Sequence, residues 1–212
     1  MKPTEKPRPY HHGNLVEALI AAAIDIIEDS GVERLSVREV AKRAGVSPGA
    51  PFRHFSSKAA LLTAVAEQAM EKLVAAVDAA QAHIGADDPL GGIEAIGRGY
   101  LDWAISNPTH FQIISSRTLI DFDASPRLRE SNEALRQRMI ALLEQASSEG
   151  RIADGLDFDR LVLASRALVY GLARMAIDGH FPEWHPHEDP REAAAGALRL
   201  FIAQMAASNT GS

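Results

Sequence analysis

The sequence predicts an all-α fold, with a small N-terminal helical domain at residues 1–60 and a larger helical domain at residues 61–212. Apolar residues recur at helical spacing along almost the whole chain, and no segment shows the period-two alternation of a half-buried strand. Glycine and proline interrupt this spacing at intervals that suit helix ends. The chain of 212 residues, 46% of them hydrophobic, is long enough to bury two cores.

The composition excludes several classes of protein. No apolar run approaches the roughly 18 residues that span a bilayer, and the N-terminal segment lacks the hydrophobic stretch of a signal peptide. The chain has no cysteine, which excludes disulfides and thiol chemistry. We therefore expect a cytoplasmic protein without a membrane partner.

Charge is unevenly distributed along the chain. The net charge is −6, but residues 1–60 hold nine basic and seven acidic side chains, a balance of +2, which leaves −8 for the remainder. Because an acidic surface repels nucleic acid, only the N-terminal domain is expected to approach DNA.

Residues 14–30 are predicted to form an opening helix with one apolar face. That face consists of Leu15, Leu19, Ala22, Ala23, Ile26 and Ile27. A second helix is expected to begin at Ser36, which can cap it while Glu39, three residues later, bonds back in a capping box. Gly45 can adopt the left-handed conformation that ends this helix. Its apolar stripe comprises Val37, Val40, Ala41 and Ala44, with Leu35 and Val40 as a hydrophobic staple.

A short third helix is predicted directly after this turn. Ser47 suits its N-cap and Pro48 its first helical position. Ala50, Arg53 and His54 are spaced i, i+3 and i+4, so they share one face that can enter a major groove. This segment is therefore the candidate recognition helix.

A longer helix at residues 57–84 is expected to join the two domains. Ser56 and Ser57 precede Lys58, so the positive end of the helix and a lysine together form an anion site suited to a phosphate. From Arg34 to Lys58 the chain has six basic residues and one acidic residue, the local excess that phosphate neutralisation needs. Together these features indicate a DNA-binding helix-turn-helix.

Breaks rich in glycine, proline and aspartate separate the remaining predicted helices. A break at residues 86–92 precedes a helix that ends before Pro108, and a short helix and a loop at residues 121–126 follow. The last three helices are predicted at residues 127–149, 158–178 and 191–206.

Residues 10–62 resemble the DNA-binding domain of the tetracycline-repressor (TetR) family of bacterial transcriptional regulators. The resemblance rests on an opening helix that ends at Gly31, followed by LSVREVAKRAGVS, PFRHF and SKAALL in the order and spacing of the family. PYHHGNL at residues 9–15 also resembles the subgroup with a C-terminal WHG domain.

The resemblance implies which residues contact DNA. Residues that match Arg38 and the candidate recognition helix face bases in this family, whereas those that match Ser36, His54 and Lys58 lie near phosphates. The full set of expected DNA-binding residues is Ser36, Val37, Arg38, Ser47, Pro48, Gly49, Ala50, Phe52, Arg53, His54 and Lys58.

Two residues depart from the family pattern. Phe52 stands where a tyrosine is common, and phenylalanine has no hydroxyl to donate to a phosphate. Pro51 lacks the amide that would bond back to Ser47, and it disfavours helical geometry at Ala50. We therefore expect an irregular start to the recognition helix.

The last two long helices are the expected contact with a second copy of the chain. Their small residues permit close approach of helices, although both helices could instead complete the chain's own core. Resemblance to the TetR family favours the dimer, because its members typically pair through a four-helix bundle of these helices. The expected interface residues are Ala164, Leu168, Gly171, Leu172, Met175, Leu198, Phe201, Ile202 and Met205.

The central helices are expected to hold a small-molecule pocket. Its expected lining is Tyr100, Trp103, His110, Phe111, Met139 and Tyr170, although an aromatic residue at helical spacing is more often plain core. GYLDWAISNPTHFQ and VYGLA resemble the subgroup's sequence here. Two positions depart from it, since Tyr170 replaces a histidine and Arg166 a tryptophan.

A histidine-rich segment, GHFPEWHPHED, is the candidate for metal binding. Imidazole and carboxylate groups bind zinc or nickel, and this segment supplies His180, His185, His187 and Glu188. Their spacing matches no standard site, and Pro182 and Pro186 indicate an exposed connection between helices. We predict neither a bound metal nor a cofactor.

These features predict a dimeric, ligand-responsive transcriptional regulator, specifically a repressor that binds a palindrome-like operator and is released by a small molecule. An enzyme is not predicted, because the chain has no phosphate-cradling glycine loop, GxSxG elbow, HExxH motif or cysteine nucleophile. A helical metal- or ligand-binding enzyme is the alternative, and it depends on the histidines and the pocket. A helical adaptor that binds only protein is a third class.

Overall fold

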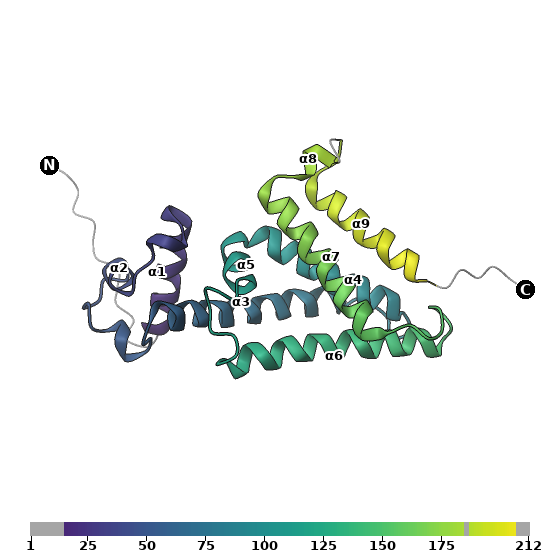
Figure 1. Ribbon diagram of the computed structural model, residues 1–212, viewed down its shortest axis with the longest axis horizontal. Coiled ribbons are helices and arrows are strands. Elements are labelled where there is room, and N and C mark those ends of the chain that lie inside the picture. Colours follow the sequence, from purple (N-terminus) through teal and green to yellow (C-terminus); the bar gives the residue numbers. More distant parts are fainter. Residues whose placement is uncertain (1–14, 185–186, 207–212) are drawn as a thin grey trace, which may run out of the picture.

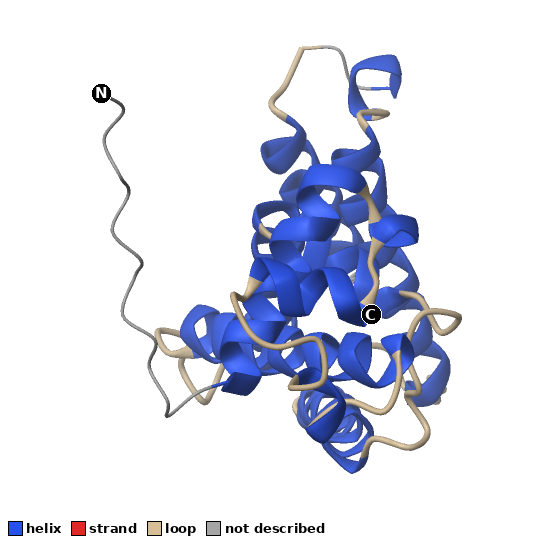
Figure 2. Cartoon of the chain, turned by 90° about the vertical axis from the view of Figure 1, so that its left-hand side faces the viewer, coloured by secondary structure: helices blue, strands red, loops and turns tan. Residues whose placement is uncertain are grey.

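The computed structural model describes residues 15–184 and 187–206, which form an all-α fold (Figures 1 and 2). The predicted fold class is confirmed. The elements are α1 (Leu15–Ser30), the 3₁₀ helix η1 (Val32–Arg34), α2 (Val37–Arg43), the 3₁₀ helix η2 (Pro51–Arg53), α3 (Lys58–Gln81), α4 (Pro89–Ser106), α5 (Pro108–Ser115), α6 (Pro126–Ser148), α7 (Phe158–Asp178), α8 (Phe181–Trp184) and α9 (Pro190–Met205). An isolated bridge between Ile152 and Ala206 is the one extended pairing in the described part of the chain.

The N-terminal domain, which we call the head, consists of α1, η1, α2, η2 and the first turns of α3. The predicted helix signals are present: Ser36 Oγ accepts a hydrogen bond from the Glu39 amide at 3.2 Å, and Gly45 has a φ of +70°. The Glu39 carboxylate lies 3.8 Å from Lys42 Nζ rather than bonding back to Ser36. Half of the capping box is therefore formed.

The predicted recognition helix is not an α-helix. Residues 48–50 form a turn, and only Pro51–Arg53 is helical, with 3₁₀ geometry. The Ala50 amide donates to the Ser47 carbonyl at 2.9 Å, which is a bond between residues three apart. The reason is Pro51, which has no amide for an α-helical bond to Ser47 and is buried in the head.

The expected irregular start is present. Ala50 itself is helical, with a φ of −62° and a ψ of −43°, although proline disfavours this geometry in the residue before it. The preference of residues before proline is a bias rather than a prohibition. Here Ala50 accepts a hydrogen bond from the Arg53 amide at 3.3 Å, which stabilises the turn.

The larger domain, which we call the body, is arranged around α4. This helix contacts α3, α5, α6, α7 and α9. In Figure 1, α3 runs from the head along the body, so the predicted boundary at residue 60 falls inside one continuous helix. Capping fixes the start of that helix, because Ser57 Oγ accepts from the Ala60 amide at 3.0 Å.

α3 and α4 pack closely at Gly99. A Cβ atom at this position would lie 2.9 Å from both the Ala76 carbonyl oxygen and the Val77 Cα atom. Backbone atoms cannot move aside as a side chain can, so only glycine fits. The packing of α3 on α4 therefore depends on this one missing side chain.

We expect Gly99→Ala to lower the free energy of unfolding by about 1–3 kcal/mol, because the added methyl group must push α3 and α4 apart. Urea unfolding followed by circular dichroism measures this change. Gly171→Ala is the matched control: nothing in the chain lies within 4 Å of a Cβ at that helical glycine, so it should be neutral or stabilising. Equal stability of the Gly99→Ala variant and the unsubstituted protein would contradict the close packing.

Candidate functional site

The candidate DNA-binding residues of the head are mostly exposed. Ser36, Arg38, Ser47, Pro48, Gly49, Phe52, Arg53 and His54 are exposed, and Ala50 and Lys58 are half-buried. Val37 differs from the rest, because it is buried in the head with 8% of its surface exposed. Its side chain belongs to the apolar stripe of α2, so a contact of this residue with DNA would have to come from its backbone at the start of the helix.

Three exposed cations on the head lack an acidic partner among the described residues. Arg34, Arg38 and Arg53 are exposed, and no carboxylate in the described part of the chain lies within 4 Å of their charged groups. In contrast, Arg43 lies 2.9 Å from Asp29 Oδ2. Positive charge that the chain does not neutralise itself is available to a polyanion.

Lys58 is already engaged within the head. Its Nζ atom donates to the Val32 carbonyl at 2.6 Å and to the Glu33 carbonyl at 3.4 Å. These bonds tie the start of α3 to η1. A phosphate at this helix end would therefore share the ammonium group with two backbone carbonyls.

Phe52 presents its ring on the head surface, with 51% of the residue exposed. Phe55, three positions later, is buried instead. The ring that departs from the family pattern thus lies on the exposed side of η2, beside the unpaired Arg53.

The body contains two adjoining cavities. The apolar cavity, of about 220 Å³, is lined mainly by aliphatic side chains of α4, α6, α7 and α9. The polar cavity, of about 250 Å³, lies between α3, α4, α6, α7 and the segment 114–122. Both are lined by Tyr100, Asn132, Leu135 and Arg166, so they share a wall.

Four of the six predicted pocket residues line these cavities. Tyr100 lines both, Met139 lines the apolar cavity, and Trp103 and Tyr170 line the polar one. Phe111 lines neither, because it is fully buried and packs against the rings of Tyr100 and Tyr170. Phe111 is therefore a residue of the hydrophobic core rather than of a pocket.

His110 also lies outside both cavities. It is 8% exposed, and its Nε2 atom lies 3.4 Å from Lys72 Nζ on α3. Burial lowers the pKa of His110, and the nearby Lys72 ammonium lowers it further. The imidazole is therefore held neutral between α5 and α3.

The polar cavity has a lining residue that sequence reasoning missed. Arg117 follows α5, and its Cζ atom lies 3.3 Å from the centre of the Phe122 ring, a cation–π contact. It is the one basic residue between Arg98 and Arg127, which is the only signal that the sequence offers. No helical spacing marks it, because it lies in a loop.

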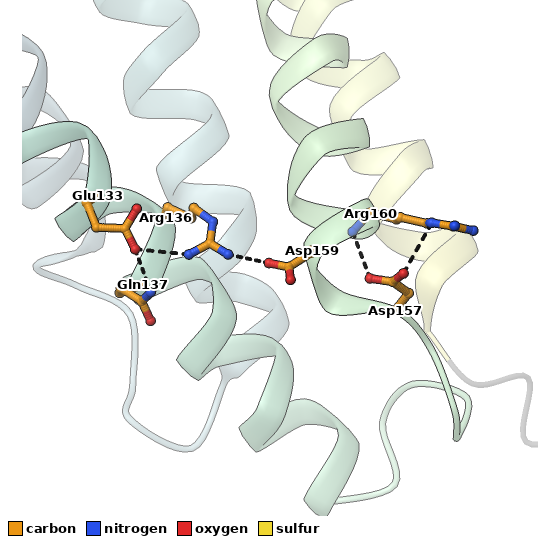
Figure 3. Close-up of polar contacts among 6 residues, drawn as sticks. All are labelled: Glu133, Arg136, Gln137, Asp157, Asp159 and Arg160. Carbon is orange, nitrogen blue, oxygen red and sulfur yellow. Dashed lines mark hydrogen bonds and ion pairs between the residues drawn. The ribbon is translucent and has the colours of Figure 1, made fainter. Parts of the chain in front are cut away.

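An ion-pair network joins α6 to α7 at the apolar cavity (Figure 3). Arg136 donates to Glu133 at 2.9 Å and to Asp159 across the two helices, and Gln137 donates to Glu133 at 2.6 Å. The hydrogen bond to Asp159 raises the pKa of Arg136, and the bond from Gln137 lowers the pKa of Glu133. Arg136 and Asp159 themselves line the cavity, so this exposed pair spans its rim.

The candidate dimer residues fall into two groups. Leu172, Leu198 and Ile202 are buried in the chain's own core, so a second copy cannot contact them in this conformation. Ala164 is exposed, and the remaining ones, Leu168, Gly171, Met175, Phe201 and Met205, are half-buried. Two large apolar residues that were not predicted, Leu163 on α7 and Leu200 on α9, are 66% and 63% exposed.

The histidine-rich segment is only partly described. His185 lies outside the described residues, as does most of the PYHHGNL segment. His180 Nδ1 lies 3.7 Å from Glu183 Oε2. Within residues 15–184 and 187–206, no three histidine or acidic side chains are grouped as a metal site requires. None of the helices in this part of the chain combines the length and apolar character needed to cross a bilayer.

Comparison with known proteins gives matches to both domains. Residues 19–65 match the bacterial regulatory proteins of the tetR family, and residues 93–201 match the tetracyclin repressor-like C-terminal domain. The HTH-type transcriptional regulator BetI of Stenotrophomonas maltophilia is 32% identical over 77% of this chain and 77% of its own length. The nucleoid occlusion factor SlmA of Vibrio cholerae is 29% identical over 73% of this chain and 79% of its own length.

A solved structure of a protein of unknown function from Rhodococcus sp. RHA1 is similar over nearly the whole chain. It is 28% identical, covers 95% of this chain and all of its own, and has a TM-score of 0.77. The homologues and the fold are those of transcriptional regulators rather than enzymes.

We expect the stability of the fold to fall as the pH drops below about 6.5, the ordinary pKa of histidine. In that range the unfolded chain binds a proton at residue 110 that the folded chain does not, because burial lowers the pKa of His110 in the folded state. His110→Gln should therefore lose less thermal stability than the unsubstituted protein between pH 7.5 and pH 5.5. His83→Gln, at an exposed histidine, is the control and should keep the full loss. Equal losses in all three proteins would contradict the assignment to His110.

Proposed function

This chain belongs to the TetR family of bacterial transcriptional regulators, and from that premise we propose that it is a cytoplasmic, ligand-responsive repressor that binds a palindrome-like operator as a homodimer. Members of this family bind DNA and small-molecule effectors, usually as dimers. One observation carries the proposal for this chain: Arg34, Arg38 and Arg53, which are exposed and have no acidic partner among the described residues, lie together on a domain that is net basic in an otherwise acidic protein.

Arg38 and Arg53 are the proposed centres of DNA contact. Arg38 projects from α2 and Arg53 from η2, and both are exposed without an acidic partner in the described part of the chain. An arginine can donate two hydrogen bonds to the O6 and N7 atoms of guanine. We assign this base-reading role to Arg38 and a mixed base and phosphate role to Arg53, His54 and the turn at Pro48 and Gly49.

The proposed dimer interface is the outward face of α7 and α9. Leu163, Ala164 and Ala167 are exposed on α7, and Leu200 and Ala203 on α9. Exposed leucines beside small residues allow a second pair of helices to approach closely and bury apolar surface. A two-fold axis through this face would present two heads to two half-sites.

Coupling between cavity and head is proposed to run through α3. Lys58 bonds α3 to the head, and Met70, twelve residues or about 18 Å along the helix, lines the polar cavity. The segment that carries Arg117 is tied to the same helix: the Asp121 amide donates to Thr63 Oγ1 at 2.9 Å. Ser125 Oγ donates to Glu67 Oε1 at 2.6 Å.

A ligand that changes the position of this segment would therefore displace the head half of α3. An operator accepts two heads only at a matching separation, roughly 34 to 36 Å for one helical turn of DNA. A ligand that binds better to a different separation would release the DNA. This is the proposed route of induction.

Selection of bound fragments from random DNA tests the operator proposal, and we expect an enriched palindrome. With Arg38→Ala, we expect a loss of about 1–3 kcal/mol on the selected operator and a relaxed preference at one base pair of each half-site. Lys42→Ala removes the same charge from the same helix at a side chain that is 80% exposed, and it should leave the preferred sequence unchanged. An Arg38→Ala variant that selects the same sequence at every position would exclude base reading by Arg38.

The double variant Leu163→Glu, Leu200→Glu tests the dimer. We expect a monomer by analytical ultracentrifugation and at least a tenfold loss of operator affinity, because four carboxylates would face each other across the two-fold axis. Leu156→Glu, at an exposed leucine in the loop before α7, is the control and should remain dimeric. A double variant that still forms a dimer would place the interface elsewhere.

A further inference from the structure

The polar cavity carries two arginines that the chain does not neutralise. Arg117 and Arg166 both line it, and no carboxylate of the described residues lies within 4 Å of either guanidinium. Burial lowers the pKa of Arg117, the Arg166 charge lowers it further, and Asp123 opposes both effects. Both residues are also exposed, so water screens part of their repulsion, and an anion bound between them would relieve the remainder.

The same cavity offers hydrogen-bond donors without acceptors. Trp103 is 5% exposed, and its indole Nε1–H is the one buried side-chain donor of the described residues that has no partner. A buried N–H group without an acceptor destabilises the protein, so an acceptor supplied by a ligand would be bound favourably there. Burial raises the pKa of Tyr100 to about 12, despite the opposing charge of Arg166. Its phenol therefore stays protonated and can donate as well.

The apolar cavity continues from this charged end. It shares Tyr100, Leu135 and Arg166 with the polar cavity. Beyond them, and apart from Ser165 and the Arg136–Asp159 ion pair, its wall is mainly aliphatic and includes Ile93, Ile96, Val162, Val169, Leu198 and Ile202. A molecule that enters both cavities must present an anionic, hydrogen-bond-accepting end to one and a hydrocarbon to the other.

We propose that the effector is a carboxylate-bearing amphiphile, with its carboxylate between Arg117 and Arg166 near the Trp103 indole and its hydrocarbon chain in the apolar cavity. This inference rests on the ligand-binding part of the proposed function and adds the chemical class of the ligand. The carboxylate would neutralise the facing arginines and accept the unpartnered indole N–H. A neutral or cationic amphiphile would leave both arginines uncompensated.

Decanoate, decanol and decyltrimethylammonium are suitable probes because they share one ten-carbon chain and differ in charge. Calorimetric titration of the full chain should show that decanoate binds at least about tenfold more tightly than decanol, since hydrogen bonds to charged groups exceed neutral ones. Decyltrimethylammonium should bind least. Equal binding of the acid and the alcohol would overturn the proposal.

Trp103 provides a reporter at the site. The other tryptophan, Trp184, is 77% exposed on α8, and Trp184→Phe leaves Trp103 as the sole indole. Decanoate should change the fluorescence of this variant with the dissociation constant found by calorimetry. Binding without any change in Trp103 fluorescence would place the amphiphile at another site and overturn the assignment.

Arg117→Met and Arg166→Met keep much of the side-chain volume and remove the charge. Each should weaken decanoate binding at least about tenfold and leave decanol binding unchanged. Arg129→Met is the matched control, at an exposed arginine of α6 that lines neither cavity. Arg117 lies in a loop, so that variant should fold, which its thermal midpoint would verify. Undiminished decanoate binding by Arg117→Met would refute the carboxylate site.

Operator binding separates this inference from the proposed function. If decanoate binds as described but does not release the operator, the ligand class stands and the induction route fails. If the protein binds its operator but decanoate does not bind, or the arginine variants bind it undiminished, the proposed regulator function stands and the carboxylate inference fails.

Discussion

The continuous helix α3 is the constraint on which the rest of the structure depends. Leu61, Leu62 and Val65 near its start are fully buried, and Leu73 and Val77 further along bury against the body. Because an α-helix is stiff over this length, the head cannot move on the body without bending α3 or repacking it on α4. The glycine at position 99 makes that packing backbone to backbone, so repacking means a discrete shift of the two helices.

Local chemistry made most of the helices predictable, and it also explains in part why the recognition segment is not an α-helix. Ser36, Ser57 and Gly179 mark helix ends through bonds and angles within a few residues, which the sequence specifies directly. The segment after Ser47 carries a cap and a proline that suit an α-helix, but Pro51 has no amide to bond back to Ser47. This local signal predicts the irregular start, although it does not predict that only one 3₁₀ turn follows.

The site residues also divide into those that local sequence predicts and those that depend on tertiary packing. Periodicity identifies the apolar positions of α7 and α9 but not which of them face inward, since that depends on the packing of α4 against both helices. Leu172, Leu198 and Ile202 therefore turned out to be buried, and Leu163 and Leu200 exposed. Periodicity gives no information about a loop, so Arg117 was not among the predicted pocket residues.

Uncompensated positive charge occurs on the head and at the polar cavity of a chain whose net charge is −6. A ligand shifts a conformational equilibrium only by as much as its contacts differ between the two states. Contacts with α4 and α7 alone would not differ when the head moves, because those helices belong to the body. Arg117 belongs to the segment that is bonded to α3 at Thr63 and Glu67, and Met70 of α3 itself lines the polar cavity. In the proposed route of induction, a ligand would therefore act on the position of α3 through its contacts in the polar cavity, and the rest of the apolar cavity would contribute affinity.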